Sequence, residues 1–338
     1  MIKEPIILAI ESSCDDTSAA ISKGREILSN EIANQKIHSE YGGVVPELAS
    51  RAHQQNIIPV VDAAIKKAKI HKENIDAIAF TQGPGLLGSL LVGSSFAKSV
   101  AMGLNIPLIT VNHMQAHILA HFIDDNKQTP KFPFLCLTVS GGHTQIVKVE
   151  STNKMEVIGT TIDDAAGEAF DKSAKILNLP YPGGPLIDKY SKNGNIHAFK
   201  FGKPKVKDLD FSFSGLKTSI LYKINNNLQK NTNFIDENLK DLCASIQHSI
   251  IIILLEKIEK AIKKTGIKEI AIAGGVSANS YFRSKLKDLA NHKKYNIYIP
   301  KTEYCTDNAA MVAISGYFKY LAKDFSDQNN TPSARLLF

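Results

Sequence analysis

Histidines recur at steps of four in the segment NHMQAHILAH, at positions 113, 117 and 121. Residues four apart lie on one face of a helix, so His113 and His117 are able to bind the same metal ion. In zinc metalloproteases a glutamate directly follows the first histidine, but here Met114 takes that place and the protease's general base is missing. Two histidines alone are also compatible with a half-exposed polar face that holds no metal.

A third ligand would decide between these alternatives. His121 extends the same stripe, but three turns of one straight helix spread too far to close on a single ion. A distant carboxylate is the better candidate, and Asp307 in CTDNAAMVA is one. It lies in a loop just before a predicted helix, where the local pattern by itself favours an N-cap over a metal ligand.

Acidic residues follow the first apolar run of the chain, in AIESSCDDTSAAI. An acid at the end of a strand can act as a base or orient a metal-bound water. Asp15 and Asp16 suit ordinary turn solvation, whereas Glu11 ends an apolar strand and is harder to explain in that way. We therefore take Glu11 as a candidate functional acid.

Glycine pairs occur at three predicted strand or helix ends, in VSGGHTQI, YPGGPLID and AGGVSANS. Glycine lets backbone N–H groups approach an anion without a Cβ in the way, so three such turns favour a nucleotide cradle. Asp164, Glu168 and Asp171 share one face of the helical stretch DDAAGEAFDK, part of which suits an ordinary solvated face. An aspartate near a glycine-lined pocket is also able to accept hydrogen bonds from a ribose or an amine. No turn matches the Walker phosphate loop or the dinucleotide fingerprint, which disfavours P-loop kinases and dehydrogenases.

Short β-rich runs alternate with longer amphipathic runs along the chain, which indicates an α/β fold with two lobes. Strands are predicted at residues 6–12, 17–23, 75–83, 107–112, 134–139, 144–150, 269–273 and 295–299. Helices are predicted at residues 47–70, 86–104, 113–121, 163–179, 185–192, 239–266, 279–292 and 308–323. The polar, Pro-bearing stretch 127–133 is the predicted lobe boundary, and the tail from Phe325 is predicted to be loose.

The chain has 338 residues, of which 43% are hydrophobic and 22% charged, a balance typical of soluble globular proteins. The formal net charge of +7 suits an anionic partner such as a nucleic acid, although a generally basic proteome explains it equally well. Four cysteines without a Cys-x-x-Cys pair suit a reducing compartment. Because no signal peptide or membrane-length apolar run is recognised, we predict a cytoplasmic protein that does not enter a membrane.

Ten segments, in order along the chain, resemble the tRNA adenosine threonylcarbamoyltransferase family, TsaD, which was once labelled sialoglycoprotein endopeptidase. The segments are ILAIESSCDDTSAAI, YGGVVPELASRAHQQNI, TQGPGLLGSLLVG, VNHMQAHILAH, VSGGHTQIV, DDAAGEAFDKSAKIL, YPGGP, FSFSGLKT, GGVSANSYFR and YCTDNAAMVA. They cover nearly the whole chain, from about residue 6 to residue 319, which makes the resemblance specific. The missing glutamate after His113 is the physical reason to set aside the endopeptidase label.

The resemblance implies an α/β, two-lobed actin-like and sugar-kinase-like (ASKHA) ATPase fold with a duplicated core. The N-terminal lobe would comprise residues 1–130, completed by a C-terminal helix at 308–324, and the C-terminal lobe would comprise residues 131–307. The implied reaction transfers a threonylcarbamoyl group from threonylcarbamoyl-AMP to the exocyclic N6 amine of adenosine 37, in tRNAs that read ANN codons. AMP is released, so an ATP/AMP-type nucleotide is part of the substrate.

The family's metal is held by residues that correspond here to His113, His117 and Asp307, with Fe2+ as the favoured ion and Zn2+ as the alternative. The family's substrate site corresponds to Thr138, Val139, Ser140, Gly141, Gly142, Asp171, Gly184, Asp188 and Asn279. Relatives often carry an aliphatic residue where this chain has Thr138, which is tolerated if the contact there is mainly with the backbone. Glu11 is the candidate for steering or deprotonating the target amine, whose lone pair is delocalised into the purine.

The resemblance also implies partners: tRNA, a TsaB-like paralogue that pairs through the N-terminal lobe, a TsaE-like ATPase and an upstream threonylcarbamoyl-AMP synthase. The helix from Leu86 to Met102 is rich in glycine and serine, so another helix can approach it closely unless these residues pack inside the protein. Basic residues expected to face tRNA phosphates are Lys203, Lys205, Lys207, Lys217 and Arg283. The alternative functions are a small-molecule kinase or ATPase of the same fold, and a non-catalytic scaffold paralogue.

Overall fold

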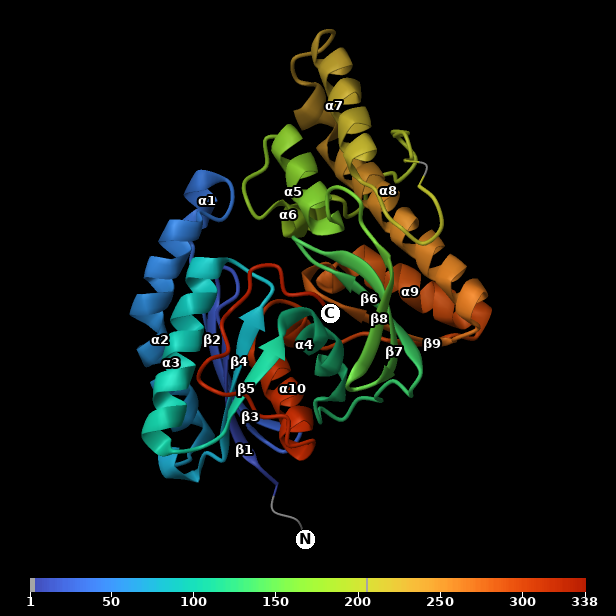
Figure 1. The fold of residues 1–338 in the computed structure, drawn as a ribbon. Helices are drawn as coiled ribbons and strands as arrows, with labels where there is room; N and C mark the ends of the chain where they lie inside the picture. Colours follow the sequence, from blue (N-terminus) through green and yellow to red (C-terminus); the bar gives the residue numbers. More distant parts are fainter. Residues whose placement is uncertain (1–3, 205) are drawn as a thin grey trace. The chain divides into compact units, whose positions relative to one another are not determined.

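The computed structural model describes residues 4–204 and 206–338, which form two compact units. Unit 1 extends to Thr129 and is completed by Thr306–Phe338, whereas unit 2 is the continuous stretch Pro130–Cys305. Each unit contains a five-stranded sheet with helices packed on it (Figure 1). Unit 1 is therefore assembled from two stretches of chain that are distant in the sequence.

The sheet of unit 1 has the strand order β3-β2-β1-β4-β5. Its strands are β1 (Ile6–Glu11), β2 (Thr17–Lys23), β3 (Glu26–Ala33), β4 (Ala77–Gly83) and β5 (Leu108–Asn112). The first three strands form an antiparallel meander, and β1, β4 and β5 run parallel to one another. The parallel strands are buried on both faces, which explains their nearly continuous runs of Ile, Ala and Val.

The sheet of unit 2 repeats this plan, with the strand order β10-β9-β6-β7-β8. Its strands are β6 (Phe134–Val139), β7 (Thr144–Ser151), β8 (Lys154–Thr160), β9 (Glu269–Ala273) and β10 (Asn296–Tyr298). Again the first three strands in the chain form an antiparallel meander, and the first, β6, runs parallel to β9, which runs parallel to β10. The repeated order and direction confirm the duplicated α/β core that the sequence predicts.

Two strands, β3 and β8, are missing from the sequence-based prediction. Both lie at a sheet edge, and both contain several polar or charged residues, as EILSNEIA and KMEVIGT. An edge strand is only partly buried, so its sequence does not need the apolar run that identifies a central strand. Pairing with β2 and β7 supplies the backbone hydrogen bonds that make these segments strands.

Two long helices of unit 1, α2 (Pro46–Ala68) and α3 (Leu87–Leu104), pack on one side of its sheet. The other side is covered by α10 (Ala309–Leu321), which contacts β1, β4 and β5 (Figure 1). The remaining helices of the unit are α1 (His38–Tyr41), α4 (His113–Leu119), and the short 3-10 turns η1 (Lys72–Asn74) and η2 (Ala120–Phe122). The helix nearest the end of the chain therefore forms part of the core of the first unit.

The helices of unit 2 surround its sheet and one another. They are α5 (Ala166–Ile176), α6 (Gly183–Tyr190), α7 (Ser214–Leu228), α8 (Phe234–Thr265) and α9 (Ser280–Lys293), with 3-10 turns η3 (Gly275–Ala278) and η4 (Thr302–Tyr304). Buried side chains of β6, such as Leu135 and Leu137, form one core with those of α5 and α8, including Phe170 and Ile250. Helix α7 is a further element that the sequence-based prediction does not contain.

The C-terminal tail is docked on unit 1, so the prediction of a loose tail from Phe325 is wrong. The Ser326 N–H donates to the carbonyl of Leu108 at 2.8 Å, and the Ser333 N–H donates to the carbonyl of Gln82 at 2.9 Å. A Cβ on Gly83 would lie 1.9 Å from the Ser333 carbonyl oxygen, so glycine is required for this close approach. We refer to residues 325–337 as the C-terminal strap.

Among the described residues, α3 is the one helix with the length and apolar composition of a possible membrane span. It packs against α2 and β4, and about a third of it is buried (33%). Its exposed apolar side chains include Leu87 and Leu91. Core helices of globular domains pass the same test of length and composition.

Candidate functional site

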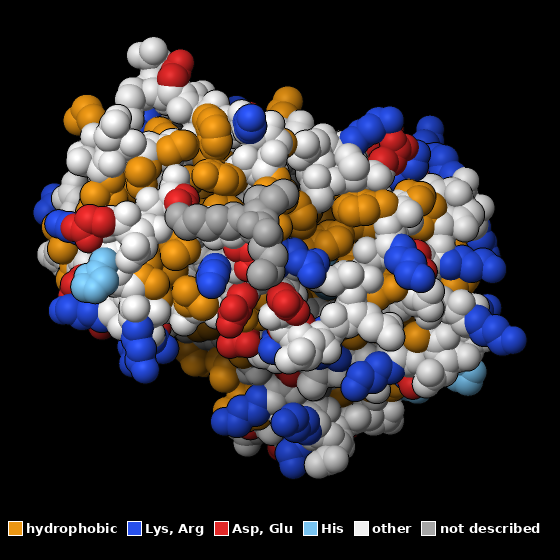
Figure 2. All heavy atoms as spheres, turned by 90° about the horizontal axis from the view of Figure 1, so that it is seen from below, with side chains coloured by type: hydrophobic (Ala, Val, Ile, Leu, Met, Phe, Trp, Pro, Cys, Tyr) orange, Lys and Arg blue, Asp and Glu red, His pale blue; other side chains and the backbone are white. Residues whose placement is uncertain are grey.

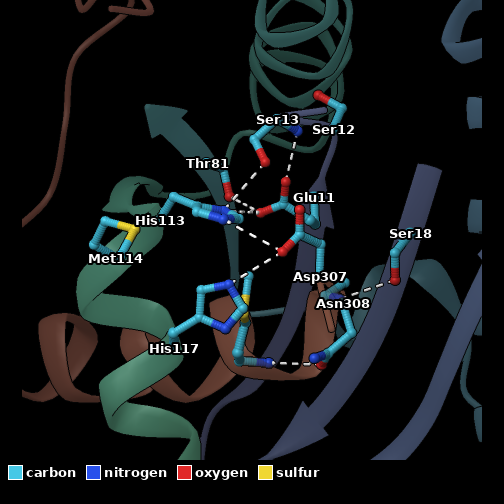
Figure 3. A network of polar contacts seen from close by, with 12 residues as sticks. Glu11, Ser12, Ser13, Ser18, Thr81, His113, Met114, His117, Asp307 and Asn308 are labelled. Carbon is cyan, nitrogen blue, oxygen red and sulfur yellow. Dashed lines mark hydrogen bonds and ion pairs between the residues drawn. The ribbon is translucent and has the colours of Figure 1, made fainter. Parts of the chain in front are cut away.

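Functional side chains of unit 1 gather where its parallel strands end. Carboxyl ends of parallel strands meet at one edge of a sheet, which is where α/β proteins commonly bind ligands. Glu11 is the last residue of β1, and Thr81 lies on β4 one residue beyond the Phe80 that pairs with Ile10. β5 ends at Asn112 and leads directly into α4, so the first histidine reaches the same edge (Figure 3).

Asn112 fixes the start of the histidine helix. Its side-chain oxygen accepts hydrogen bonds from the N–H groups of Met114 at 2.9 Å and Gln115 at 3.2 Å, which is the geometry of an N-cap. His113 and His117 then lie on successive turns, with ring centroids 4.7 Å apart. The helix ends at Leu119 and continues as a 3-10 turn, so the spacing of four is not maintained as helix to position 121.

Asp307 meets these histidines because α10 packs on α4 and on the sheet of unit 1. Its Oδ1 lies 3.1 Å from Nε2 of His117 and 3.4 Å from Nε2 of His113. The alternative prediction that Asp307 is an N-cap is wrong, because Asn308 performs that role and accepts from the Met311 N–H at 3.2 Å. Asp307 is thereby left to face the two imidazoles.

These three side chains form a candidate metal site. Their ligand atoms all lie within 4.8 Å of one another. Ligands about 2.0–2.1 Å from a tetrahedral centre lie roughly 3.3 Å apart, which agrees with the 3.1 and 3.4 Å separations from Asp307 to the imidazoles. Two imidazoles and a carboxylate also suit a divalent iron or zinc ion with open coordination positions. The residues present fit a metal ion.

The carboxylates and imidazoles of the candidate metal site stabilise one another's charged forms. Burial acts to lower the pKa of His113, but Asp307 and Glu11 together raise that pKa well above its usual value. Burial acts to raise the pKa of Asp307, but His113 and His117 hold it well below its usual range. A proton therefore occupies the group in the absence of a metal, and a metal ion must displace it.

Glu11 lies behind His113 and is completely buried, with 0% of its surface exposed. Its Oε1 accepts from the Ser13 N–H at 2.6 Å, and its Oε2 accepts from the Thr81 hydroxyl at 2.5 Å. The same Oε2 lies 3.1 Å from Nδ1 of His113 (Figure 3). Burial acts to raise the pKa of Glu11, but His113 outweighs it and lowers that pKa, so Glu11 carries a negative charge.

In unit 2, the first predicted ligand segment is the turn that follows β6. The Ser140 N–H donates to the carbonyl of His143 at 2.8 Å, and the His143 N–H donates back to the Ser140 hydroxyl at 3.1 Å, which closes a tight turn. Gly141 and Gly142 are exposed, and a Cβ on either would meet open space. Their backbone is therefore accessible to a ligand.

The residues just before this turn point into the protein. Thr138 and Val139 are both fully buried, and the Thr138 hydroxyl lies 3.4 Å from the carbonyl oxygen of Gln145. Their side chains are thus part of the sheet and the core. Any ligand contact from these two residues would involve their backbone.

Two further glycines allow α5 and the turn after β9 to pack closely against the turn after β6. Gly167 of α5 donates its N–H to the Ser140 carbonyl at 3.1 Å, and a Cβ on Gly167 would lie 2.5 Å from that oxygen. Gly274 follows β9 with a φ of +88°, and a Cβ there would lie 2.5 Å from the Val139 carbonyl oxygen. The turn after β6, the start of α5 and the turn after β9 are therefore in close contact within unit 2.

Asp171 binds the first turn of α6. Its Oδ1 accepts from the N–H groups of Gly183 at 2.8 Å and Gly184 at 3.2 Å. Burial, opposed by these two hydrogen bonds, raises the pKa of Asp171 above its usual value. Asp164 and Glu168 of the same segment have a different partner, because both form ion pairs with Lys172.

Asp188 and Asn279 connect helices of unit 2. The Asp188 carboxylate accepts from the Ser280 N–H at 3.0 Å and from the Ser280 hydroxyl at 2.8 Å. Asn279 caps α9, and its side-chain N–H donates to Oε1 of Gln247 at 2.6 Å. Gln247 also donates to Ser191 at 2.8 Å, so it links α6, α8 and α9.

Sequence reasoning missed Thr81, Ser13 and Gln247 as members of these networks. Thr81 and Ser13 lie in TQGPG and ESSC, next to strand ends that the chain pattern does predict. Parallel pairing of the two strands was the available signal, because it brings their carboxyl ends together. Gln247 lies inside a long apolar helix, where nothing in the sequence indicates its partners.

The basic residues that the sequence predicts to face tRNA phosphates have different surroundings in the structure. Arg283 donates to the carbonyls of Ser277 at 2.7 Å and Pro300 at 3.0 Å, so its guanidinium fixes backbone within unit 2. Lys203 is paired with Glu256, and Lys207 is exposed, while Lys205 lies outside the described residues. Figure 2 shows one face of the molecule, on which Lys and Arg side chains are dispersed among acidic and apolar ones.

Comparison with known sequences gives consistent matches over nearly the whole chain. The family model described as TsaD, tRNA N6-adenosine threonylcarbamoyltransferase, matches residues 26–314. A protein of that name from Christiangramia forsetii is 64% identical over 333 residues, 98% of this chain and 98% of its own. Another from Porphyromonas gingivalis is 58% identical over 339 residues, 99% of each chain.

Solved structures with the same fold are much more distant in sequence. Full-length HypF in its phosphate- and nucleotide-bound form has a TM-score of 0.62 and 14% identity, covering 96% of this chain and 47% of that one. The activator of the 2-hydroxyisocaproyl-CoA dehydratase from Clostridium difficile, with bound ADPNP, has a TM-score of 0.52 and 14% identity, covering 95% and 98%. Together with the repeated sheets, these likenesses confirm the predicted ASKHA fold.

Proposed function

The chain belongs to the tRNA N6-adenosine threonylcarbamoyltransferase family, TsaD, and we propose that it uses threonylcarbamoyl-AMP as the donor. In this proposal the acceptor is the N6 amine of adenosine 37 in tRNAs that read ANN codons, and AMP is the second product. The observation that carries the proposal is the convergence of His113 and His117 with Asp307, which lies 190 residues beyond His117 in the chain. Neither kinase nor scaffold function requires such a group.

The metal would be held by these three residues, with Fe2+ preferred and Zn2+ as the alternative. When bound, the ion would supply Lewis-acid polarisation of oxygen atoms on the acyl-adenylate. The protein's own contribution is to hold two imidazoles and one carboxylate at separations that suit a metal before the ion arrives. Asp307 is partly exposed, with 29% of its side chain accessible, so the donor group is not sealed from solvent.

The AMP part of the donor is assigned to unit 2. The exposed backbone of Gly141 and Gly142, in the turn after β6, would donate N–H groups to phosphate or ribose oxygens. Thr138, Val139 and Ser140 contribute through the backbone of the same segment, in line with the burial of the first two side chains. Backbone donors of this kind are held by the sheet and need little reorganisation during reaction.

The remaining ligand residues lie along α5, α6 and α9. Asp171 is held against the first turn of α6 at Gly184, and Asp188 and Asn279 are held against α9 and α8. Because Asp171 uses only Oδ1 for the glycine N–H groups, its Oδ2 can accept from a ribose hydroxyl. We propose that these side chains orient the nucleotide while keeping their structural hydrogen bonds.

The acceptor must be an exposed base, because a stacked and paired adenine hides its amine. An anticodon loop presents unstacked bases, and the net charge of +7 favours association with its phosphates. The proposed phosphate contacts in the described residues are Lys203, Lys207 and Lys217, of which Lys203 also pairs with Glu256 and Lys217 also lies 3.8 Å from the Asp164 carboxylate. Arg283 is removed from that role by its backbone hydrogen bonds.

We further propose a TsaB-like paralogue as a partner of unit 1, through α3. Leu87 and Leu91 of this helix are 50% and 47% exposed, and Met102 is 70% exposed. Gly88 and Ser95 are also exposed on this helix, whereas Ser89, Gly93 and Ser94 are buried inside unit 1 and serve its own packing. A TsaE-like ATPase and an upstream threonylcarbamoyl-AMP synthase complete the proposed set, and the proposed location is the cytoplasm, with no membrane involved.

The proposal is tested by mass spectrometry of digested tRNA. Unmodified tRNA, threonylcarbamoyl-AMP and the full chain with its proposed partners are incubated, and threonylcarbamoyladenosine is quantified. The variant His113→Ala should lose the product, whereas His292→Ala, which changes an exposed histidine of α9, should keep it.

The outcomes separate the alternatives. Product from His113→Ala at the wild-type rate would retain the transferase and remove the metal role. No product from the wild-type chain, in a mixture that a related enzyme can drive, would favour the kinase or scaffold functions. ATP hydrolysis without tRNA dependence would then distinguish the kinase or ATPase from the scaffold.

A further inference from the structure

Glu11 cannot readily act on a bound amine, because both of its oxygens are already engaged inside the protein. Oε1 accepts from the Ser13 N–H, and Oε2 accepts from the Thr81 hydroxyl while lying 3.1 Å from Nδ1 of His113. The side chain is 0% exposed. A general base must reach the proton that it removes, which this carboxylate does not do without breaking its hydrogen bonds.

We infer that Glu11 is a positioning residue, which acts on the metal through His113, and that Thr81 holds Glu11 in place for this purpose. The inference rests on the proposed function only in assigning a metal to His113, His117 and Asp307. It replaces the predicted direct role of Glu11 on the amine. It adds Thr81, for which the sequence predicts no function.

The carboxylate of Glu11 selects the tautomer of His113. His113 must be neutral to bind a metal ion, so the ion displaces one of its protons, and the carboxylate at Nδ1 keeps the remaining proton on Nδ1. The lone pair is then on Nε2, which is the nitrogen that lies 3.4 Å from Asp307 in the candidate metal site. Metal-binding histidines commonly donate their second N–H to a carboxylate, which orients the ring and strengthens the ligand.

The sheet of unit 1 holds the Glu11 carboxylate in place. Glu11 ends β1 and Thr81 lies on the neighbouring parallel strand β4, so the sheet sets the distance between them. The Ser13 hydroxyl also lies 3.2 Å from Nδ1 of His113, on the same side as the carboxylate (Figure 3). The ring of His113 is therefore held by a network built on two strands and the loop after β1.

The two histidines of the candidate metal site differ in their hydrogen bonding at Nδ1. Nδ1 of His117 is buried and has no hydrogen-bond partner among the described residues. His113 is thus the ligand whose orientation is fixed in advance by a carboxylate. Loss of Glu11 should therefore weaken metal binding through one ligand and leave the other in place.

The substitution Glu11→Gln tests this inference sharply. Glu11 accepts from three donors, and glutamine has only one oxygen, so an NH2 group must face either the Ser13 N–H or the Thr81 and His113 side. In the second orientation the NH2 group forces the proton of His113 onto Nε2 and blocks the metal-binding lone pair. In the first orientation the Ser13 N–H is left facing another donor.

Thr81→Val is the second variant, because valine keeps the shape of threonine and removes the hydroxyl that Glu11 accepts from. Glu47→Gln is the matched control, since Glu47 is an exposed residue of α2 with 68% of its side chain accessible. Each full-length variant is titrated with Zn2+ and Fe2+ against a chromophoric chelator. The absorption spectrum of the Co2+ form reports the ligand geometry, and circular dichroism verifies folding.

We expect Glu11→Gln to weaken metal binding about 10- to 100-fold and to change the Co2+ spectrum. Thr81→Val should produce a smaller loss in the same direction, and Glu47→Gln should match the wild type. Transferase activity of Glu11→Gln, measured by the nucleoside digest, should recover at saturating metal. If Glu11→Gln does not fold, a folded Thr81→Val with unchanged metal affinity overturns the inference.

A different pattern would support direct catalysis instead. If Glu11→Gln binds metal with wild-type affinity and spectrum but makes no product at saturating metal, Glu11 acts on the substrate and the inference is wrong. Failure of the transferase proposal would look different, because the wild-type chain would then make no product while Glu11→Gln still lost metal affinity. Absence of metal binding by the wild type would overturn the inference and the metal role together.

Discussion

At the scale of single residues, side chains of similar type that lie close together in the sequence have different roles in and around the candidate metal site. Asp307 and Asn308 are adjacent and both are common N-caps, yet only Asn308 caps α10 and only Asp307 faces the imidazoles. Glu11 and Asp16 differ in a similar way, because Glu11 faces His113 and stays ionised, while burial and the neighbouring acids Asp15, Asp307 and Glu11 raise the pKa of Asp16. Local pattern does not distinguish such pairs, since it is the tertiary neighbour that sets each role.

The raised pKa of Asp16 predicts how the free energy of unfolding of the protein depends on pH. Burial, together with the charges of Asp15, Asp307 and Glu11, raises the pKa of Asp16 to about 7, against a hydrogen bond from Asn34 that lowers it. The folded chain therefore keeps this proton up to about pH 7, while the unfolded chain loses it near pH 4. Between these values the folded state binds more protons, so the contribution of Asp16 to stability falls as the pH rises.

The substitution Asp16→Asn removes this titration and keeps an acceptor for Asn34. We expect it to raise the melting temperature more at pH 8 than at pH 5, as measured by differential scanning calorimetry. An equal change at both pH values would show that Asp16 titrates in its ordinary range in the folded protein.

At the scale of elements, α10 is the part of the fold that completes the candidate metal site. It is apolar almost throughout, and residues 309–316 are buried against β1, β4 and α4. Gly316 permits its close approach to the sheet, because a Cβ there would lie 2.6 Å from Cβ of Ala79. The position of Asp307 depends on this contact, since Asp307 immediately precedes the helix.

Gly316→Ala should therefore destabilise the protein, by about 1–3 kcal/mol, because the added methyl group overpacks the interface between α10 and the sheet. Gly103→Ala is the matched control, as Gly103 lies in α3 and a Cβ there meets nothing within 4 Å. That control should increase stability by about 0.5–1 kcal/mol. Urea unfolding of both variants measures the difference, and a Gly316→Ala variant as stable as the control would contradict the close packing.

The C-terminal strap contacts the same edge of unit 1. The Asn112 side chain donates to the Leu337 carbonyl at 2.9 Å, in addition to capping the histidine helix. Asn112→Asp keeps the oxygen that caps α4 and removes the donor to the strap. We expect faster hydrogen exchange in residues 326–337 of this variant by mass spectrometry, with no loss of the α4 cap.

Asn112→Ala serves as the comparison, because it removes both interactions and should cost about 1 kcal/mol for the lost cap. If Asn112→Asp exchanges at the wild-type rate throughout residues 326–337, the hydrogen bond to Leu337 does not hold the strap.

At the scale of the whole molecule, the two units differ in how the chain builds them. Unit 2 is the continuous stretch Pro130–Cys305 and has its own buried core of β6, α5 and α8 side chains. Unit 1 needs Thr306–Phe338 to cover its sheet and to supply Asp307. The proposed AMP ligands lie in unit 2, and the candidate metal site lies in unit 1.

We expect a fragment of residues 130–305 to unfold cooperatively by itself, because every helix and strand of that unit is present. A fragment of residues 1–129 should not fold stably, since without α10 one side of its sheet is exposed. Circular dichroism melting curves of the two fragments test both expectations. Cooperative unfolding of residues 1–129 with wild-type metal affinity would contradict the role given to α10.

The sequence alone determined the elements whose signal is local. Central strands such as β1 and β6, and amphipathic helices such as α2, follow from runs and periodicities that burial imposes on each segment. The ten family segments also identified the α/β duplicated fold and the family, because they extend over nearly the whole chain. The pairing of His113 with His117 follows from helix geometry in the same way.

Only the tertiary structure decided what depends on distant partners. The edge strands β3 and β8, the docking of the strap and the Thr81–Glu11–His113 network all arise from contacts between segments far apart in the chain. Asp307 joins the histidines because α10 packs beside β1, and no local pattern contains that fact. The spacing of residues in the sequence shows which of them share a face of one helix or strand. Which strand and helix ends lie next to one another depends on the order of the strands in the sheet and on the helices packed against it.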